Sequence, residues 1–297
     1  MKILITGSQG QLGNTLSNLL KVKNNSLGHI PEEYNNCEVI GVDVNELDIT
    51  NRKKVEEFIN RTQPDLIINC AAMTNVDGCE TERNLAEAVN AEGPENLAIA
   101  ANNVGAKIVH VSTDYVFQGD AATPYIETDT CNPVTAYGES KRNGEIKVAN
   151  ATDRHFIFRT SWLYGLVGNN FVKTIRRVAK EKGALTVVND QRGNPTNCED
   201  LAFHILLVAI TDNYGIYHCT GNGECTWFDF AKKIVEFSNI PCTVDPCTTE
   251  QSNRPAKRPA FSSLDNKHLR ETVGDNMRNW TVALKEYISK LEQSENI

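Results

Sequence analysis

The chain has 297 residues, of which 40% are hydrophobic and 23% charged, and its formal net charge is −8. This length fits one large or two unequal globular domains, and the acidic balance argues against a nucleic-acid-binding protein, which would need a basic patch. The sequence has no apolar run of the ~20 residues that a membrane span requires, and its N-terminus lacks the features of a signal peptide. We therefore expect a cytoplasmic protein with no membrane or nucleic-acid partner.

The first half of the chain alternates between strand-like and helix-like patterns. We expect strands at residues 2–6, 37–43, 64–72, 107–113 and 155–165, and helices at 11–22, 50–62 and 84–105. The last helix is expected to break near Gly93 and Pro94, and the polar residues 23–36 are expected to form an inserted loop. Apolar strands separated by helices are typical of a parallel sheet covered on both faces. The predicted fold class is therefore α/β, with a doubly wound, Rossmann-like parallel sheet.

The pattern loosens after about residue 165, where Pro, Asn and Gly become frequent in stretches 189–197 and 239–260. This predicts a dinucleotide-binding domain over residues 1–165 and a smaller, loop-rich α/β substrate domain over residues 166–297. Part of 196–222 is expected to return to the first domain. The nine cysteines are scattered without a CxxC pair, which indicates reduced thiols and favours neither a disulfide framework nor a zinc site.

Three glycines follow the first expected strand in "TGSQGQLG": Gly7, Gly10 and Gly13. Glycines at a strand–turn–helix junction let the backbone approach a pyrophosphate, and the helix N-terminus adds free N–H groups. The stretch predicts dinucleotide binding, with a purely structural tight turn as the alternative. Asp43, after the second strand, is the candidate for the adenosine ribose, and its carboxylate favours NADH over NADPH. Asp48 is a second candidate, and for both the alternative is a capping or turn aspartate.

The fourth strand ends in the hydroxyl-rich "VSTDYVFQG", and "AYGESK" follows. Ser112 and Thr113 are expected at the strand end that faces the ligand crevice. Tyr137 and Lys141 would share one face of the next helix. Reduction of a ketone by hydride produces an alkoxide that needs a proton, which a tyrosine can donate if a nearby ammonium stabilises its phenolate. The three features together predict a carbonyl reductase.

These residues resemble the extended short-chain dehydrogenase/reductase family, and within it the branch that reduces the 4-keto group of dTDP-4-dehydrorhamnose. The resemblance is carried by "ILITGSQGQLG", "LDIT", "NCAAMTNVDGCE", "VNAEGPENLA", "VSTDYVFQG", "AYGESKRNGE", "RTSWLYG", "NDQRGNPT" and "RPAFSSLD". It implies NADH or NADPH as cofactor, a dTDP-sugar as substrate and a homodimer. The implied reaction is the last step in the synthesis of nucleotide-activated rhamnose.

The resemblance also implies roles for individual residues. The catalytic residues would be Tyr137, Lys141 and Thr113. The cofactor would contact Gly7, Gly10, Gln11, Leu12, Gly13, Asp43, Asp48, Ile49, Ala71, Ala72, Met73, Val111, Tyr137 and Lys141. The substrate would contact Thr74, Thr113, Asp114, Trp162, Gln191 and Arg258. The alternative for Trp162 is core packing, and for Arg258 a surface charge.

The sequence departs from the branch at Met73, where tyrosine is frequent in the family. Some relatives carry Mg²⁺ at a subunit interface, but no carboxylate pattern here demands a metal. Two alternative functions stay open. One is a reductase or epimerase of another nucleotide-linked 4-keto sugar. The other is a non-catalytic, dinucleotide-binding regulatory subunit of the methionine adenosyltransferase type.

Overall fold

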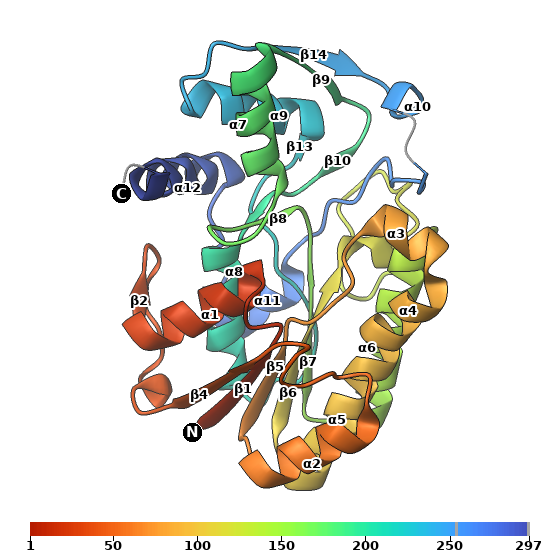
Figure 1. The fold of residues 1–297 in the computed structure, drawn as a ribbon, viewed down its shortest axis with the longest axis vertical. Helices are drawn as coiled ribbons and strands as arrows, with labels where there is room; N and C mark the ends of the chain where they lie inside the picture. Colours follow the sequence, from red (N-terminus) through yellow and green to blue (C-terminus); the bar gives the residue numbers. More distant parts are fainter. Residues whose placement is uncertain (253–254, 296–297) are drawn as a thin grey trace.

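The structure, a computed structural model, describes residues 1–252 and 255–295. The chain forms two lobes, and the larger is built on a six-stranded sheet with the order β12-β7-β6-β5-β1-β4 (Figure 1). Its strands are β1 (Lys2–Thr6), β4 (Glu38–Val42), β5 (Leu66–Asn69), β6 (Lys107–Thr113), β7 (His155–Thr160) and β12 (Gly215–His218). All neighbouring strands in it run parallel. The predicted doubly wound α/β class is confirmed.

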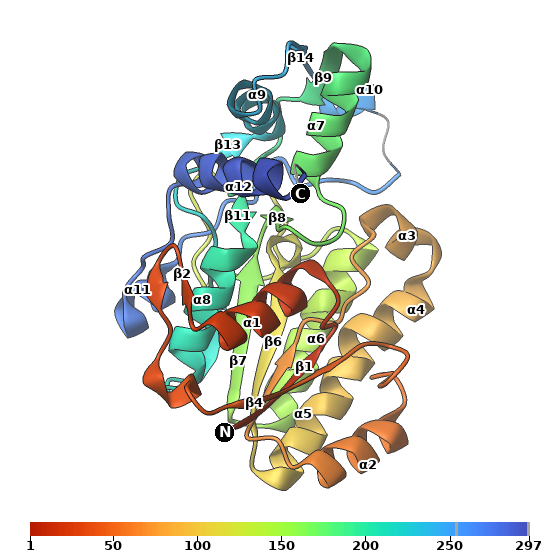
Figure 2. The same cartoon turned by 60° about the vertical axis from the view of Figure 1, so that its left-hand side comes forward.

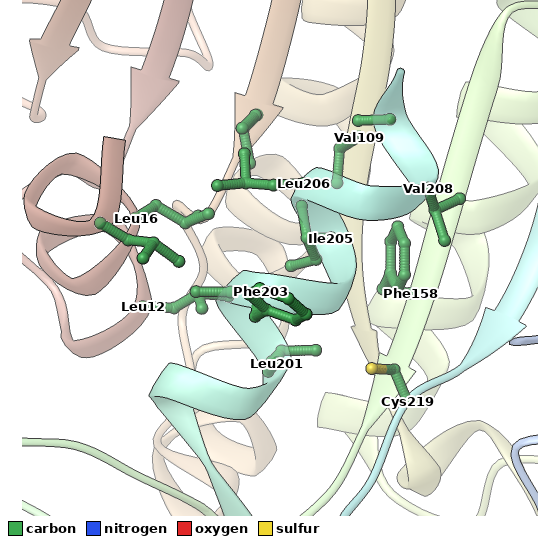
Figure 3. Packing of buried hydrophobic residues seen from close by; sticks show 14 of the residues in the cluster. Leu12, Leu16, Val109, Phe158, Leu201, Phe203, Ile205, Leu206, Val208 and Cys219 are labelled. Atoms are coloured by element: carbon green, nitrogen blue, oxygen red, sulfur yellow. The ribbon is translucent and has the colours of Figure 1, made fainter. Parts of the chain in front are cut away.

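Helices cover both faces of this sheet because strand side chains alternate between the faces. Ile3 and Ile5 of β1 face α1 (Gln11–Val22) and α8 (Cys198–Ala209) in one buried apolar cluster (Figure 3). Leu4 belongs to the cluster on the other face. That face is covered by α2 (Arg52–Thr62), α5 (Gly93–Val104) and α6 (Ala136–Ala151).

The chain reverses its direction across the sheet at β1, which lies between β4 and β5. At such a switch point the connections leave to opposite sides, so a crevice opens beyond the carboxyl ends of the strands. Figures 1 and 2 show the second lobe beyond these same ends. The strand ends at which such a crevice is expected therefore face the second lobe.

The expected break near Gly93 and Pro94 does not interrupt the helical path. The chain runs through α4 (Arg83–Glu87), a π-helical turn (Ala88–Glu92) and directly into α5. Pro94 lies in the first turn of α5, where its missing N–H removes no helical hydrogen bond. The expectation of a break was wrong because a π turn absorbs the irregularity.

The predicted fifth strand, 155–165, is two strands. β7 ends at Thr160, and Trp162 adopts a left-handed backbone with φ 47°. β8 (Leu163–Tyr164) then pairs with β11 (Thr196–Asn197) outside the large sheet. The turn at Trp162 thus sends the chain out of the first lobe.

The second lobe contains α7 (Phe171–Lys182), α9 (Trp227–Phe237) and α12 (Trp280–Glu295), which share one apolar core. Beside them lie the parallel pair β9 (Ala184–Val188) and β14 (Thr243–Cys247), and α10 (Thr249–Ser252). β10 (Arg192–Gly193) and β13 (Cys225–Thr226) form a short antiparallel pair.

Several later segments return to the large sheet. β12 pairs with β7, α8 packs beside α1, and α11 (Lys267–Val273) contributes Leu269 to the same cluster. The inserted loop 23–36 contains the hairpin β2 (Asn24–Asn25) and β3 (Gly28–His29) and a 3-10 turn (Glu32–Tyr34). Tyr34 anchors it by donating to the carbonyl of Leu206 at 2.9 Å. The domain boundary at residue 165 stays a prediction.

Candidate active site

Each of the three positions in the first turn requires glycine for a different structural reason. Gly7 has φ +65°, and a Cβ there would lie 2.7 Å from the amide nitrogen of Ala71. A Cβ on Gly13 would lie 2.3 Å from the carbonyl oxygen of Gly7. Gly10 is the N-cap of α1 and lacks a side chain that could cover the first N–H groups of the helix. The turn therefore keeps the N-terminus of α1 open, which suits a pyrophosphate.

A crevice of about 340 Å³ opens beside this turn. We call it the glycine crevice. Its lining includes Gly7, Gly10, Asp43, Asp48, Ile49, Ala71 and Ala72. A Cβ on Gly7 or Gly13 would collide with neighbouring backbone. Glycine at these positions lets the backbone approach a pyrophosphate closely, so the residues present fit a dinucleotide.

Both candidate aspartates line the crevice but also bond the backbone nearby. Asp43 accepts from the amide of Gln9 at 3.2 Å, which ties it to the glycine turn. Asp48 accepts from the amide of Thr50 at 3.0 Å and from its hydroxyl at 2.7 Å. Asp43 also accepts from the amide of Val44 at 3.0 Å, so both aspartates form local turns as well as crevice walls, and the assignment of the ribose to Asp43 stays a prediction.

Helix α6 carries Tyr137 and Lys141. It begins after Thr135, whose side chain accepts from the amide of Gly138 at 3.0 Å. A Cβ on Gly138 would lie 2.2 Å from the carbonyl oxygen of Tyr115, so glycine lets the first turn of α6 approach the segment that follows β6. This close approach brings Tyr137 to Thr113, and a side-chain hydrogen bond links the two.

Lys141 is 2% exposed and donates to the carbonyl of Val111 at 2.6 Å. Burial lowers the pKa of Lys141 to about 8, while Glu145 and Cys70 act in the opposite direction. Burial also raises the pKa of the Tyr137 hydroxyl above its ordinary value, and Thr113 opposes this. The expected lowering of the Tyr137 pKa by Lys141 stays a prediction.

Thr113 and Asp114 meet at the end of β6. The Thr113 hydroxyl donates to the Asp114 carboxylate at 2.9 Å, and Asp114 is 2% exposed. Burial raises the pKa of Asp114 to about 6, although Ser262 and Thr113 beside it act to lower it. The Asp114 carboxylate is thus shielded from solvent beside the hydroxyls of Thr113 and Tyr137.

Ser112 does not join this group. Its hydroxyl donates to Glu145 at 2.6 Å, on the side of the buried ion pair between Glu145 and Arg159. The expectation that Ser112 faces the crevice was wrong because successive side chains of a strand point to opposite faces.

A second and larger cavity, of about 990 Å³, lies between the second lobe and the end of β6. We call it the upper pocket. Its walls come from α7, β9, β14 and α10, and they include Tyr115, Gln191, Trp227, Cys247 and Arg258. Gln191 is 5% exposed and donates to the hydroxyl of Thr249 at 2.9 Å.

The candidate catalytic residues lie near lining residues of both cavities. Lys141 acts electrostatically on Cys70, which lines the glycine crevice. The ring of Tyr137 lies edge-on to that of Tyr115, 5.5 Å between centroids, and Tyr115 lines the upper pocket. A cofactor in one cavity and a substrate in the other would therefore meet at Tyr137.

Trp162 stacks on Trp227, with centroids 3.5 Å apart and ring planes at 9°. Its ring also covers Gly193, where a Cβ would lie 2.8 Å away. Trp162 thus backs the pocket wall that Trp227 forms. This packing fits the core-packing alternative, and contact of Trp162 with the substrate stays a prediction.

Other predicted residues lie differently from what the sequence suggested. The Gln11 side chain accepts from the amide of Gly165 at 2.9 Å and joins α1 to the second lobe. Leu12 is buried in the apolar cluster beneath α1, so its backbone alone faces the turn. Met73 packs beside Tyr137, and Thr74 is exposed.

Sequence reasoning missed Tyr115, Trp227 and Asn90. Tyr115 stands within the quoted "VSTDYVFQG" and could have been found as the neighbour of Thr113 and Asp114. Asn90, in the π turn, accepts from the amide of Met73 at 2.8 Å and donates to Ser140 at 3.0 Å. It ties the segment after β5 to α6, a long-range contact without a local sequence signal.

Across residues 1–252 and 255–295, no group of three or more His, Cys, Asp or Glu is arranged to hold a metal ion. Within the same residues, no helix is both long and apolar enough to cross a membrane. All nine cysteines are free thiols.

Residues 1–293 match the family model described as the RmlD substrate binding domain. The chain belongs to this family. A dTDP-4-dehydrorhamnose reductase of Aggregatibacter actinomycetemcomitans is 41% identical to it over 297 residues, with 96% of this chain and 97% of the relative covered. The family resemblance seen in the sequence is thereby confirmed.

Solved structures of the family share the whole fold. A dTDP-4-dehydrorhamnose reductase of Clostridium acetobutylicum has a TM-score of 0.93 at 49% identity, covering 98% of this chain and 100% of its own. The Bacillus anthracis enzyme of the same name, in complex with NADP, has a TM-score of 0.90 at 40% identity, covering 97% and 99%. Members of the family at this similarity are oxidoreductases that use a nicotinamide cofactor.

Proposed function

We propose that this protein reduces the 4-keto group of dTDP-4-dehydro-L-rhamnose to give dTDP-L-rhamnose, the last step in making nucleotide-activated rhamnose. The observation that carries the proposal is the grouping of Thr113, Tyr137 and Lys141 at the end of β6 and the start of α6, beside Tyr115, which lines the upper pocket. Family membership supports the substrate class.

The glycine turn and the N-terminus of α1 hold the dinucleotide, and Asp43 receives its adenosine ribose. A bound reduced nicotinamide supplies the hydride that adds to C4 of the sugar. Tyr137 donates its phenolic proton to the oxygen at C4, so that the ketone becomes an alcohol. Lys141 stabilises the phenolate left behind, and Thr113 orients the keto oxygen through its hydroxyl.

The upper pocket takes the nucleotide-linked end of the substrate. Arg258, on its wall, suits the diphosphate because a guanidinium is permanently charged and donates N–H groups to phosphate oxygens. Gln191 and the stacked pair Trp162 and Trp227 lie where polar and apolar parts of the ligand would pack. Asp114, beside Thr113, accepts from a sugar hydroxyl.

Asp43 favours NADH, because its carboxylate would repel the 2′-phosphate of NADPH. The Bacillus anthracis relative is a complex with NADP, so use of both cofactors is part of the proposal. A cytoplasmic homodimer completes it. The nine free thiols support a reducing compartment, and a homodimer is the commonest assembly of such enzymes. Light scattering of the purified protein checks the dimer.

The direct test is the loss of nicotinamide absorbance with freshly generated dTDP-4-dehydro-L-rhamnose, first with NADH and then with NADPH. We expect oxidation that depends on the sugar nucleotide. Protein that binds both cofactors yet oxidises neither with this substrate would refute the proposed reaction. Protein that purifies with tightly held NAD⁺ and interconverts sugar isomers without net oxidation would be an epimerase instead.

A further inference from the structure

The segment 255–264 runs between the two lobes beyond α10, and Figure 1 shows it in blue above α3 (Val76–Thr81). We call it the strap. The amide of Phe261 donates to the carbonyl of Gly119 at 3.0 Å, and that of Leu264 donates to Asn194 at 2.8 Å. Gly119 has φ +86°, and a Cβ on it would lie 2.1 Å from Pro259. The strap is therefore docked tightly on the loop that follows the catalytic strand end.

Within the described part of the chain, an ion pair between Arg258 and Asp77 fastens the strap to the cofactor side of the molecule. Arg258 donates from Nη1 to Oδ1 of Asp77 at 2.7 Å and from Nη2 to Oδ2 at 3.1 Å. Oδ1 also accepts from the amide of Ala256 at 3.0 Å, and Nη1 donates to the Ala256 carbonyl at 2.8 Å. The side chains are 17% and 25% exposed. A planar, bidentate pair of this kind fixes the direction of the guanidinium as well as its charge.

Asp77 stands on α3, which directly follows the crevice residues Ala71 and Ala72. Asn75 caps α3 by accepting from the amide of Gly78 at 3.0 Å. Glu80 on the same helix accepts from the amide of Ala136, the first residue of α6, at 2.8 Å. Helix α3 thus holds the strap with one carboxylate and the start of the catalytic helix with another.

Arg258 also lies next to the tyrosines of the candidate active site. It shares a side-chain hydrogen bond with Tyr115, whose ring lies edge-on to that of Tyr137. The three bonds to Asp77 and Ala256 leave the remaining guanidinium hydrogens for Tyr115 and for a ligand in the upper pocket that Arg258 lines.

We propose that Asp77 is a positioning residue for substrate: it holds Arg258 aimed at the upper pocket, so that the guanidinium receives the diphosphate of the nucleotide sugar without first being ordered. This rests on the proposed function, in which Arg258 binds the diphosphate. An arginine loses much rotamer freedom when a ligand immobilises it, and a carboxylate that immobilises it beforehand removes that cost from binding. The same carboxylate repels the diphosphate, and the proposal requires that the gain from ordering the guanidinium exceeds this repulsion.

The test is a double-mutant cycle on dTDP affinity, measured by calorimetry on the full-length protein saturated with NADP⁺. We expect Asp77→Asn to weaken dTDP binding about tenfold and Arg258→Gln at least as much. The double variant should bind no more weakly than Arg258→Gln alone, because Asp77 acts through Arg258. In turnover, Asp77→Asn should raise KM for the sugar nucleotide with kcat nearly unchanged, and Asp77→Glu should restore part of the loss.

Two controls separate positioning from general damage. Asp212→Asn removes a more exposed ion pair, with Lys107 at 3.0 Å, at the far end of the sheet and should leave dTDP binding unchanged. NADP⁺ affinity should be the same in every variant.

Unchanged or tighter dTDP binding by both Asp77→Asn and Asp77→Glu overturns the inference, as does full additivity in the double variant. If Arg258→Gln itself leaves dTDP affinity unchanged, the diphosphate assignment in the proposed function fails instead.

Discussion

The glycine crevice and the upper pocket are built in opposite ways. The crevice is made at the ends of three neighbouring strands, β1, β4 and β5, and backbone atoms of Gly7 and Ala71 form its floor. The upper pocket is assembled mainly from two separate stretches of the chain, one with α7 and β9 and the other with β14, α10 and the strap. The crevice thus presents backbone that few sequences can provide, and the pocket presents side chains held by long-range contacts.

This difference has a practical meaning for function. A site formed by glycines at strand ends recognises what all dinucleotides share, so its motif identifies a class of cofactor. A pocket lined by separate side chains can change its ligand through single substitutions, so it carries substrate choice. The four predictions below test this division, from the largest expected effect to the smallest.

Tyr137→Phe should lower turnover about a thousandfold, because general acid catalysis contributes on this order. The affinities for cofactor and for dTDP should stay within about twofold of the wild-type values, since the ring remains and only the proton donor is lost. Steady-state kinetics and calorimetry measure the two effects. Tyr214→Phe, at the far end of the sheet beside Lys107, is the matched control and should be fully active. A Tyr137→Phe enzyme with normal turnover would show that Tyr137 is not the proton donor.

Asp114→Asn should make the protein more stable at neutral pH while it impairs turnover. Burial raises the folded pKa of Asp114 to about 6 from 3.8. The folded state therefore holds its proton more tightly than the unfolded state, and stability falls as pH rises from about 4 to about 6 and stays lower above that. This shift corresponds to about 3 kcal/mol at most.

Urea unfolding of the wild type and Asp114→Asn between pH 4 and 8 checks this pH dependence. The stability difference between the two should grow up to about pH 6 and then level off. A difference that does not vary with pH would mean that the Asp114 carboxyl group is not protonated more readily in the folded state.

Gly13→Ala should weaken NADH and NADPH binding about a hundredfold, because the added Cβ would lie 2.3 Å from the Gly7 carbonyl and force the turn apart. The upper pocket should still bind dTDP. Gly183→Ala adds a Cβ where nothing lies within 4 Å and should change stability slightly without changing cofactor affinity. Equal loss of dTDP and cofactor binding in Gly13→Ala would argue against two separable sites.

Asp43→Asn should shift the ratio of kcat/KM for NADPH over NADH about tenfold toward NADPH, because it removes the charge that repels a 2′-phosphate. Asp48→Asn is the comparison, since that carboxylate is engaged by Thr50 and should leave the ratio unchanged. A shift in Asp48→Asn with none in Asp43→Asn would assign the ribose to the other aspartate.

The sequence predicted those parts of the site that lie within one short segment. Gly7, Gly10 and Gly13 could be assigned because a strand, a turn and a helix follow one another directly. Tyr137 and Lys141 could be paired because helical spacing alone brings them together. Ser112 was misplaced because the pattern does not reveal which face of a strand looks toward the crevice, and the break at Gly93 was wrong because a π turn leaves no clear pattern.

The sequence by itself thus determined the sheet, its wrapped helices, the glycine turn and the Tyr137–Lys141 pair, since local periodicity and spacing encode all of these. Only the tertiary structure decided that Tyr115 joins the upper pocket to Tyr137, that Trp162 stacks on Trp227, and that Asp77 holds Arg258. These contacts join residues from separate lobes and loops. Their partners are chosen by how the lobes pack, which no short stretch of sequence specifies.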